Sequence, residues 1–484
     1  MAQKEFVSKD VFFTLVPCRK RDRIYGFWDM LFIQICFGIG AWFFLIGSQT
    51  GMWLAAKQAV PTIIFGNTLG LLLMGSVAII SARYGVEQLF GSVAIFGPKF
   101  TIVNIIFFFI TSLCALALAS LMFAQGAIKL WGTIVSPDAF LASDAPGATI
   151  WAVLCLLTGF IIASRGPATM AWFTRIAAVF MITVLGALIV YLLAHVGIDD
   201  IFAAKPAGQI VIEGDPDLSN RWNIASAFEI NMGLGLSWAY FYGQYTRLAK
   251  SEITGYQGCM WGWGALACVA GVFSAFAALA IGQYDPTAWL VAMSSNVGFP
   301  ILALVGLVLM AVANISSIAT IIYPAAITVV SNYPRVKWGP ALAIATIPAL
   351  VLLTPGFYGR IASIYAIIGL INGIYGAIIV ADYYFISKGV YKLRHLYNSK
   401  EGYQYFHGVN PAAAISMAFG LIFYLWTLNP VTWGSANGWF PYITAGVPTV
   451  ILTAILYVVL MKVWIVKIYP SPIKYEKEVE APSS

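Results

Sequence analysis

The chain has 484 residues, of which 60% are hydrophobic and only 10% are charged, and its formal net charge is +7. A soluble domain carries about 25% charged residues, so this composition excludes an ordinary soluble protein. The basic excess does not indicate nucleic acid as a partner, because the Lys and Arg residues lie between long apolar stretches.

The first 26 residues are polar and basic, and the first apolar stretch begins near Phe27. That stretch is too long for the apolar part of a cleavable signal peptide. We therefore expect residues 1–26 to form a cytoplasmic N-terminal segment.

Apolar stretches of bilayer-spanning length then follow one another to the end of the chain. A helix needs roughly 20 residues to cross the hydrocarbon core of a bilayer. The stretches lie at 27–50, 60–82, 101–128, 149–164, 172–196, 225–243, 259–282, 298–328, 338–354, 361–386, 409–428 and 440–466. The sequence thus predicts an all-α integral membrane protein with twelve transmembrane helices.

The basic residues predict the orientation of these helices. With the N-terminus inside, all but five of the 27 Lys and Arg residues fall in cytoplasmic segments, and the five outside are Lys57, Lys129, Lys205, Arg221 and Arg360. Positive charge collects on the cytoplasmic side of membrane proteins. We therefore predict a multi-pass protein of the cell membrane with both termini in the cytoplasm.

Two stretches are interrupted by paired glycines, Gly38-Ile39-Gly40 in the first and Gly233-Leu234-Gly235 in the sixth, 195 residues apart. Broken helices at matching places in two halves are typical of a transporter site near the middle of the membrane. Alternatively, the glycines only allow close helix packing. The predicted division is a first five-helix repeat (27–197), an extracellular loop (198–224), an inverted second repeat (225–388), a cytoplasmic loop (389–408), two C-terminal helices (409–466) and a cytoplasmic tail (467–484).

The eighth stretch carries oxygen ligands on one face, because Ser316 and Ser317 lie three and four residues after Ala313. Two hydroxyls and a backbone carbonyl suit a small alkali cation, and carbonyls freed near Gly38 could complete the shell. The alternative is that both hydroxyls bond to carbonyls of the preceding turn.

Trp42 and Trp238 lie near the two interruptions, where aromatic faces can stack on a planar ligand. Glu229 is an ionisable residue in the sixth stretch, which makes it a candidate proton carrier, although it could also be solvated from outside. The sequence shows no nucleophile with a base and no metal-ligand spacing, so we do not expect an enzyme.

Short motifs in the second half give a family resemblance. Asp382-Tyr383-Tyr384, Leu396-Tyr397, Gly402-Tyr403 and Gly408-Val409-Asn410 resemble the loop after helix 10 in the first nucleobase:cation symporter family, which includes purine-cytosine permeases and hydantoin and allantoin transporters. Gly243-Gln244-Tyr245-Thr246-Arg247 and Tyr333-Pro334-Arg335-Val336 are similar to further elements of that family.

The resemblance implies a LeuT-type fold, which consists of two inverted five-helix repeats plus two C-terminal helices. It also implies a sodium ion between the first and the eighth predicted helix. The implied sodium ligands are the hydroxyls of Ser316 and Ser317 and the carbonyls of Cys36, Ile39 and Ala313. The expected substrate-binding residues at the two interruptions are Gly38, Gly40, Trp42, Gly233, Gly235 and Trp238. Asn314 and Thr320 are the candidates for the position of an asparagine that holds the substrate amide in relatives of the resembled family. The chain departs from the family at Gln244, where relatives have an acid, and at Ala115 and Ala119 in helix 3, where relatives place larger side chains against the substrate.

We therefore expect a monomeric transporter that imports a nucleobase or related nitrogen heterocycle with Na+ as the coupling ion and no organic cofactor. The alternatives are a proton-coupled permease for amino acids or other metabolites, with Glu229 as the proton carrier, and a passive channel.

Overall fold

The structure, a computed structural model, describes residues 17–297, 300–397 and 402–469. Within these ranges the regular structure is helical, and the only β-type pairings are two isolated bridges. Helices are the expected solution for an apolar chain in lipid, because each helix satisfies its own backbone hydrogen bonds.

The helices that build the membrane part follow in chain order. They are α2 (Phe27–Gly38), α3 (Ala41–Trp53), α4 (Ala56–Tyr84), α5 (Gln88–Phe96), α6 (Thr101–Ile134), α7 (Pro146–Ser164), α8 (Pro167–His195), α9 (Ile198–Ala203), α10 (Pro216–Leu236), α11 (Tyr242–Thr246), α12 (Glu252–Cys259), η3 (Met260–Ala267), α13 (Cys268–Ile281), α14 (Pro286–Val297), α15 (Pro300–Asn332), α16 (Trp338–Thr346), η4 (Ile347–Leu352), α17 (Pro355–Tyr358), α18 (Ile361–Ala381), η5 (Asp382–Ile386), α19 (Leu393–Tyr397), α20 (Pro411–Thr427), α21 (Phe440–Ile443), α22 (Gly446–Leu460), η6 (Met461–Ile465) and α23 (Val466–Ile468).

In the described part of the chain, eight helices are long and apolar enough to cross a membrane, and the bent pair of α2 and α3 makes a ninth. Three predicted spans fall short of that standard. The α16–η4 helix and α20 are apolar but short, and α10 carries Asp217, Arg221 and Glu229. The all-helical membrane fold is thus confirmed, whereas the number twelve stays a prediction.

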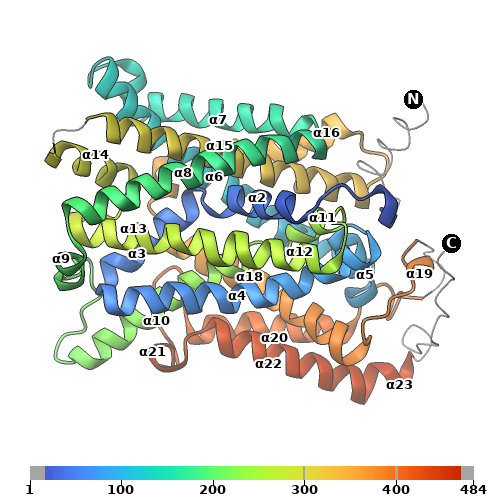
Figure 1. The fold of residues 1–484 in the computed structure, drawn as a ribbon. Coiled ribbons are helices and arrows are strands. Elements are labelled where there is room, and N and C mark those ends of the chain that lie inside the picture. Colours follow the sequence, from blue (N-terminus) through green and yellow to red (C-terminus); the bar gives the residue numbers. More distant parts are fainter. Residues whose placement is uncertain (1–16, 298–299, 398–401, 470–484) are drawn as a thin grey trace.

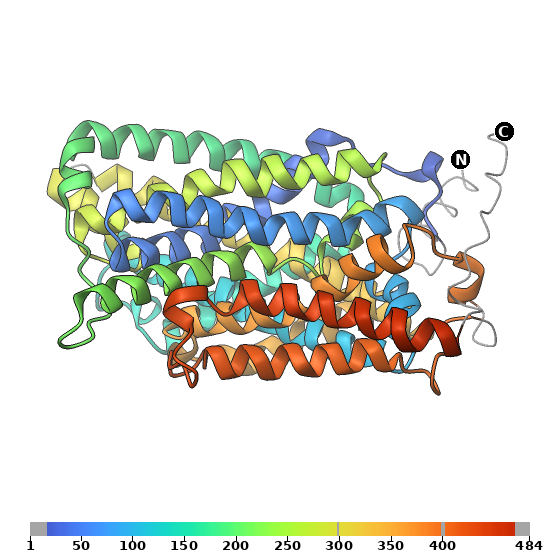
Figure 2. The same cartoon turned by 90° about the horizontal axis from the view of Figure 1, so that it is seen from below.

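Two groups of helices are apparent from the packing. The α4 group consists of α2, α3, α4, α10, α11, α12 and α13, and the α15 group consists of α6, α7, α15 and α16. Helix α18 packs on α10 and α22, and α20 packs on α22. In Figure 1, α7 and α22 accordingly lie at opposite edges, and Figure 2 shows the same bundle from below.

Short helices gather at the two ends of the bundle. Figure 1 places α5, α19 and α23 at one end, called the α5 end below, and α9 and α14 at the other, the α14 end. The described residues of the segments predicted to be cytoplasmic thus lie at one end, and those of the segments predicted to be extracellular lie at the other. Residues 1–16, 398–401 and 470–484 of the predicted cytoplasmic segments lie outside the described residues. Which side of the membrane each end faces stays a prediction.

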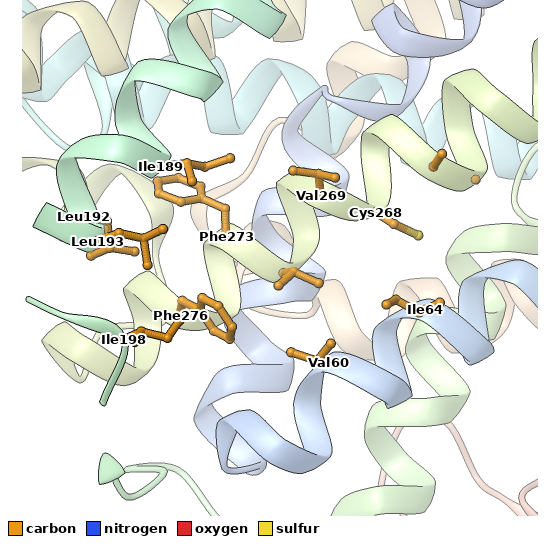
Figure 3. Close-up of a pocket in the computed structure, with 13 residues that line it drawn as sticks. Val60, Ile64, Ile189, Leu192, Leu193, Ile198, Cys268, Val269, Phe273 and Phe276 are labelled. Atoms are coloured by element: carbon orange, nitrogen blue, oxygen red, sulfur yellow. The ribbon is translucent and has the colours of Figure 1, made fainter. Parts of the chain in front are cut away.

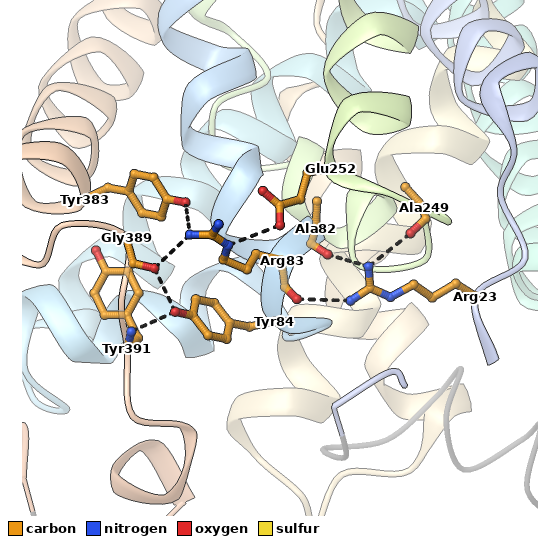
Figure 4. A network of polar contacts seen from close by, with 9 residues as sticks. All are labelled: Arg23, Ala82, Arg83, Tyr84, Ala249, Glu252, Tyr383, Gly389 and Tyr391. Atoms are coloured by element: carbon orange, nitrogen blue, oxygen red, sulfur yellow. Dashed lines mark hydrogen bonds and ion pairs between the residues drawn. The ribbon is translucent and has the colours of Figure 1, made fainter. Parts of the chain in front are cut away.

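Arg23 anchors the start of α2 at the α5 end (Figure 4). Its guanidinium donates to the carbonyls of Ala82 at 2.5 Å, Ala249 at 3.3 Å and Arg83 at 3.3 Å. Carbonyls at helix ends lack intrahelical partners, so an arginine fork satisfies several at once. These bonds fasten segments of the α4 group to one another.

Arg83, at the end of α4, continues the network. Its Nε lies 3.1 Å from the Glu252 carboxylate at the start of α12, and its Nη1 donates to the Tyr383 hydroxyl at 2.9 Å and the Gly389 carbonyl at 3.0 Å. The end of α4 is therefore tied both to α12 and to the segment after α18.

At the α14 end, Lys129 of α6 forms an ion pair with Asp285, just before α14, at 2.8 Å. The Tyr358 hydroxyl donates to the other carboxylate oxygen at 3.3 Å. On α14 itself, the indole N–H of Trp289 donates to the Ser48 hydroxyl of α3 at 2.9 Å. Helix α14 is therefore attached to α6 of the α15 group and to α3 of the α4 group.

We expect Lys129→Asp and Asp285→Lys each to lower the melting temperature of the purified protein, and the double exchange to recover most of the loss. The pair is only 29% and 18% exposed, so reversing one charge places two like charges side by side where water solvates them poorly, at a cost of about 1–3 kcal/mol. The matched control is Glu252→Gln in the more exposed pair with Arg83, where the cost should stay below about 1 kcal/mol. A double exchange as unstable as the sum of the single changes would contradict the pairing.

Candidate functional site

The first predicted interruption is present. Helix α2 ends at Gly38, α3 begins at Ala41, and the pair is bent by 50°. Gly40 lies against α15, because a Cβ atom built on it would be 2.1 Å from the Ser317 hydroxyl oxygen. Any side chain at position 40 would therefore push the break away from α15.

The predicted cation ligands gather at this break. Ser317 donates its hydroxyl to the Cys36 carbonyl at 3.0 Å, and the Ser316 hydroxyl lies 3.5 Å from the same oxygen. Ser316 also bonds to the Ala313 carbonyl at 2.9 Å. Ile39, whose carbonyl was the fifth predicted ligand, is the first residue after α2.

The two serine hydroxyls follow different interpretations of the predicted site, one bonding within its own helix and the other bonding to α2. Ser316 bonds within its own helix, as a serine without a ligand would, whereas Ser317 reaches across to α2. All of these residues are buried. Four uncharged oxygen atoms from two helices thus meet in the interior, which is the ligand chemistry of an alkali cation.

The second interruption is displaced from its predicted place. Helix α10 continues through Gly233 and Gly235 to Leu236, and the irregular segment is 237–241, before α11 begins at Tyr242. The prediction that Gly233-Leu234-Gly235 itself breaks the helix is therefore wrong.

The two glycines instead allow close packing, which was the alternative interpretation. A Cβ on Gly233 would be 2.6 Å from the Tyr365 carbonyl of α18, and one on Gly235 would be 2.3 Å from the Asn67 carbonyl of α4. Small residues let helix backbones approach in lipid, where van der Waals packing drives association. Helix α10 is thus held between α4 and α18.

Aromatic rings occupy the space around both interruptions. Trp238 lies in the irregular segment after α10, with its ring centroid 3.8 Å from that of Phe37 on α2 and 5.5 Å from that of Trp263. Trp42 on α3 packs edge-on against Tyr365 at 5.9 Å. The indole N–H groups of Trp42 and Trp238 are buried and have no hydrogen-bond partner among the described residues, so both could serve a ligand.

Asn314 and Thr320, the two candidates on α15, differ in what they can offer. The Asn314 amide donates to the Met310 carbonyl at 2.8 Å, and its oxygen has no partner in the described part of the chain. The Thr320 hydroxyl lies 2.9 Å from the carbonyls of both Ser316 and Ser317. Only Asn314 therefore keeps an unused polar atom.

Two further polar residues were not predicted. Both amide atoms of Gln34 on α2 and the hydroxyl of Ser112 on α6 are buried without a partner in the described ranges. Ser120, on the same helix as Ser112, instead bonds to the Leu116 carbonyl at 2.7 Å. An unpaired buried polar atom costs about 1–3 kcal/mol, so such atoms call for a functional explanation. Both residues could have been singled out in the sequence, because each is a polar residue within an apolar stretch.

Glu229 lies apart from the interruptions and has structural partners. Its carboxylate accepts hydrogen bonds from the Tyr424 hydroxyl at 2.9 Å and from the backbone N–H groups of Ala445 and Gly446, both at 3.0 Å. The last two donors form the N-terminus of α22, where the helix dipole favours a negative charge. Glu229 thus joins α10 to α20 and α22.

A cavity of about 370 Å³ opens between α4, α8, α9 and α13 (Figure 3). Its lining is apolar, and Ile64 and Val269 within it are exposed on the protein surface. This apolar cavity does not suit a heterocycle, and we take the region around the two interruptions as the candidate site because of the unpaired indole N–H groups of Trp42 and Trp238.

Comparison with solved structures places this arrangement in a known fold. The structure of Mhp1, a nucleobase-cation-symport-1 family transporter in a closed conformation with bromovinylhydantoin bound, matches with a TM-score of 0.78 and 16% identity over 96% of this chain and 97% of that chain. Its inward-facing conformation matches with a TM-score of 0.76 and 16% identity over 94% and 95%. A Na+-coupled sialic acid symporter matches with a TM-score of 0.58 and 13% identity over 95% and 94%.

These likenesses confirm the predicted LeuT-type fold. No curated protein sequence matches the chain significantly. The family described as permeases for cytosine/purines, uracil, thiamine and allantoin matches residues 17–445. Because that match spans most of the chain and agrees with the fold, the chain belongs to this family of permeases.

Proposed function

We propose that the protein imports a small, uncharged nitrogen heterocycle across the cell membrane by symport with sodium, acting as a monomer with its α5 end in the cytoplasm. The observation that carries this proposal is the group of four oxygen atoms at the break between α2 and α3, from Cys36, Ala313, Ser316 and Ser317. The predicted division into inverted repeats belongs to the same proposal.

Sodium is supported by the chemistry of the ligands. A small hard cation prefers oxygen, and the uncharged hydroxyls and carbonyls would bind it weakly enough for release. Groups of His, Cys, Asp or Glu that could hold a transition metal are absent from the described residues.

The substrate class is supported by five of the residues whose buried polar atoms have no partner in the described part of the chain. They are the indoles of Trp42 and Trp238, the amides of Asn314 on α15 and Gln34 on α2, and the hydroxyl of Ser112 on α6. These groups offer hydrogen bonds and stacking faces without a formal charge, which suits a neutral planar ring. Cytosine, purines, uracil and allantoin, four of the substrates for which the family is described, are neutral nitrogen heterocycles, as is the hydantoin bound to Mhp1.

In the proposed cycle, sodium binds between α2 and α15 and fixes the break in the orientation that accepts substrate. The substrate then docks beside Trp42 and Trp238, and the α4 group moves against the α15 group to open the α5 end. Coupling requires each ligand to raise the affinity of the other, because linkage is reciprocal.

The decisive experiment is uptake of radiolabelled cytosine, uracil, hypoxanthine, allantoin and hydantoin into cells, with sodium or choline outside. We expect one of these compounds to accumulate above its external level only with sodium. Accumulation that ignores sodium but collapses with a protonophore would contradict sodium coupling, and flux that never exceeds equilibrium would indicate a channel.

Replacing Ser316 and Ser317 together by alanine is expected to raise the sodium concentration for half-maximal uptake by about tenfold or more, since each lost ligand costs on the order of 1 kcal/mol. The matched control is Ser120→Ala, because that buried hydroxyl only bonds within α6. Unchanged sodium activation in the double variant would exclude this site.

A further inference from the structure

A buried carboxylate lies between the two helix groups at the α5 end. Glu87, in the connection between α4 and α5, is 4% exposed. It caps the N-terminus of α5, accepting hydrogen bonds from the backbone N–H groups of Leu89 at 3.1 Å and Phe90 at 2.7 Å. Capping explains a polar residue here, because the first N–H groups of a helix lack partners.

The same carboxylate has further partners that a cap does not need. Gln244 of α11 donates to Oε1 at 2.6 Å, and Thr328 of α15 donates to the same oxygen at 3.0 Å. Asn332, one turn further along α15, lies 3.4 Å from Oε2. Glu87 is therefore a shared acceptor for the α4 group, through Gln244, and the α15 group, through Thr328 and Asn332.

Burial and the neighbouring groups act on the Glu87 carboxyl in opposite directions. Burial raises the pKa of the Glu87 carboxyl, while its hydrogen bonds and the charge of nearby Arg247 act in the opposite direction. The electrostatic neighbourhood of Glu87 also includes Tyr375 and Tyr397. Hydrogen bonds to a carboxylate in a buried setting are among the stronger ones in proteins.

Other fastenings at the α5 end act differently. The Arg23 bonds in Figure 4 connect segments of the α4 group to one another, so they can move together with that group. Two uncharged bonds also cross between the groups. The Tyr245 hydroxyl donates to the Thr320 carbonyl at 2.8 Å, and the Gln244 amide donates to the Thr328 hydroxyl at 3.0 Å. Glu87 provides a negatively charged connection across the interface, and buried Arg247, just after α11, provides a positively charged one to Tyr323 of α15.

We propose that Glu87 is a positioning residue for transport, whose carboxylate holds α11 against α15 and keeps the α5 end closed until the two helix groups separate. The inference rests on the proposed function only in assuming that the α5 end opens during transport.

Position 244 carries an uncharged donor. The amide nitrogen of Gln244 is the atom that meets the Glu87 carboxylate. A second carboxylate at that distance would repel the first. The amide at position 244 is thus matched to the carboxylate at position 87.

The test measures how readily the thiol of Cys36 is reached from the α5 side. Cys36 is fully buried beside the candidate cation site, and its thiol donates to the Thr174 carbonyl at 3.4 Å. The parent protein keeps Cys36 and has its other five cysteines replaced by alanine. Inside-out membrane vesicles are treated with a membrane-impermeant maleimide, and the rate of labelling is followed without sodium or substrate.

Glu87→Ser should speed labelling by about tenfold, because serine still caps α5 but is too short to reach Gln244 and Thr328. Glu252→Gln, which removes an acid from the same end outside this cluster, should label at the parent rate. If Glu87 were only a cap, Glu87→Ser would also label at the parent rate, and that result would overturn the proposal.

Gln244→Glu supplies a second test, independent of the cap. We expect it to speed labelling by at least as much, and adding Glu87→Gln to slow labelling again, because one carboxylate and one amide then face each other. A double variant as reactive as Gln244→Glu alone would refute the proposed pairing. Because no substrate or sodium is used, failure here leaves the sodium and heterocycle assignments to their own test.

Discussion

Gly235→Ala is expected to destabilise the protein strongly, because α10 and α4 approach each other closely at this residue. The new Cβ would lie 2.3 Å from the Asn67 carbonyl oxygen and 3.1 Å from the Leu71 nitrogen, both backbone atoms of α4. A backbone atom cannot rotate away, so α4 and α10 must separate by more than about 1 Å to reach a normal contact distance of about 3.5 Å. Gly70 of α4 faces α10 equally closely, with a built Cβ 2.5 Å from the Met232 carbonyl.

Overpacking of this kind costs about 1–3 kcal/mol and often more when backbone must move. The measurement is the melting temperature and monodispersity of the purified protein, together with uptake of the substrate that the wild type accumulates. Gly186→Ala in α8 is the matched control, because a Cβ there meets nothing within 4 Å. A Gly235→Ala protein as stable as Gly186→Ala would show that α10 does not need this close approach.

Glu229→Ala is expected to lower the melting temperature strongly, by the equivalent of about 3 kcal/mol or more. The substitution leaves the Tyr424 hydroxyl and the N–H groups of Ala445 and Gly446 without their acceptor in a buried setting. Each unsatisfied donor costs about 1–3 kcal/mol, and α22 also loses the negative charge at its N-terminus.

Glu229→Gln separates this structural role from proton transport. The amide keeps one oxygen acceptor, so we expect an intermediate loss of stability and an unchanged dependence of uptake on external pH. The measurement is uptake over a range of external pH at constant sodium, compared with the wild type. A variant of wild-type stability whose uptake no longer responds to a proton gradient would instead support the proton-coupled alternative.

The sequence by itself determined the membrane class, the all-helical fold and the family resemblance. Hydropathy and charge act through the bilayer, which is a uniform solvent, so they can be read without knowing the neighbours of any residue. The spacing of Ala313, Ser316 and Ser317 was also readable, because helix geometry alone puts them on one face. The interruption at Gly38–Gly40 was found for the same local reason.

Tertiary structure decided everything that depends on a partner far along the chain. Paired glycines can break a helix or admit a neighbour, and only the approach of Asn67 and Tyr365 shows that Gly233 and Gly235 do the latter. The acceptor roles of Glu229 and Glu87 depend on donors more than 150 positions away, such as Ala445 and Gln244. Hydrogen bonds and close contacts are short-ranged, so their partners are set by how helices pack, which no local pattern encodes.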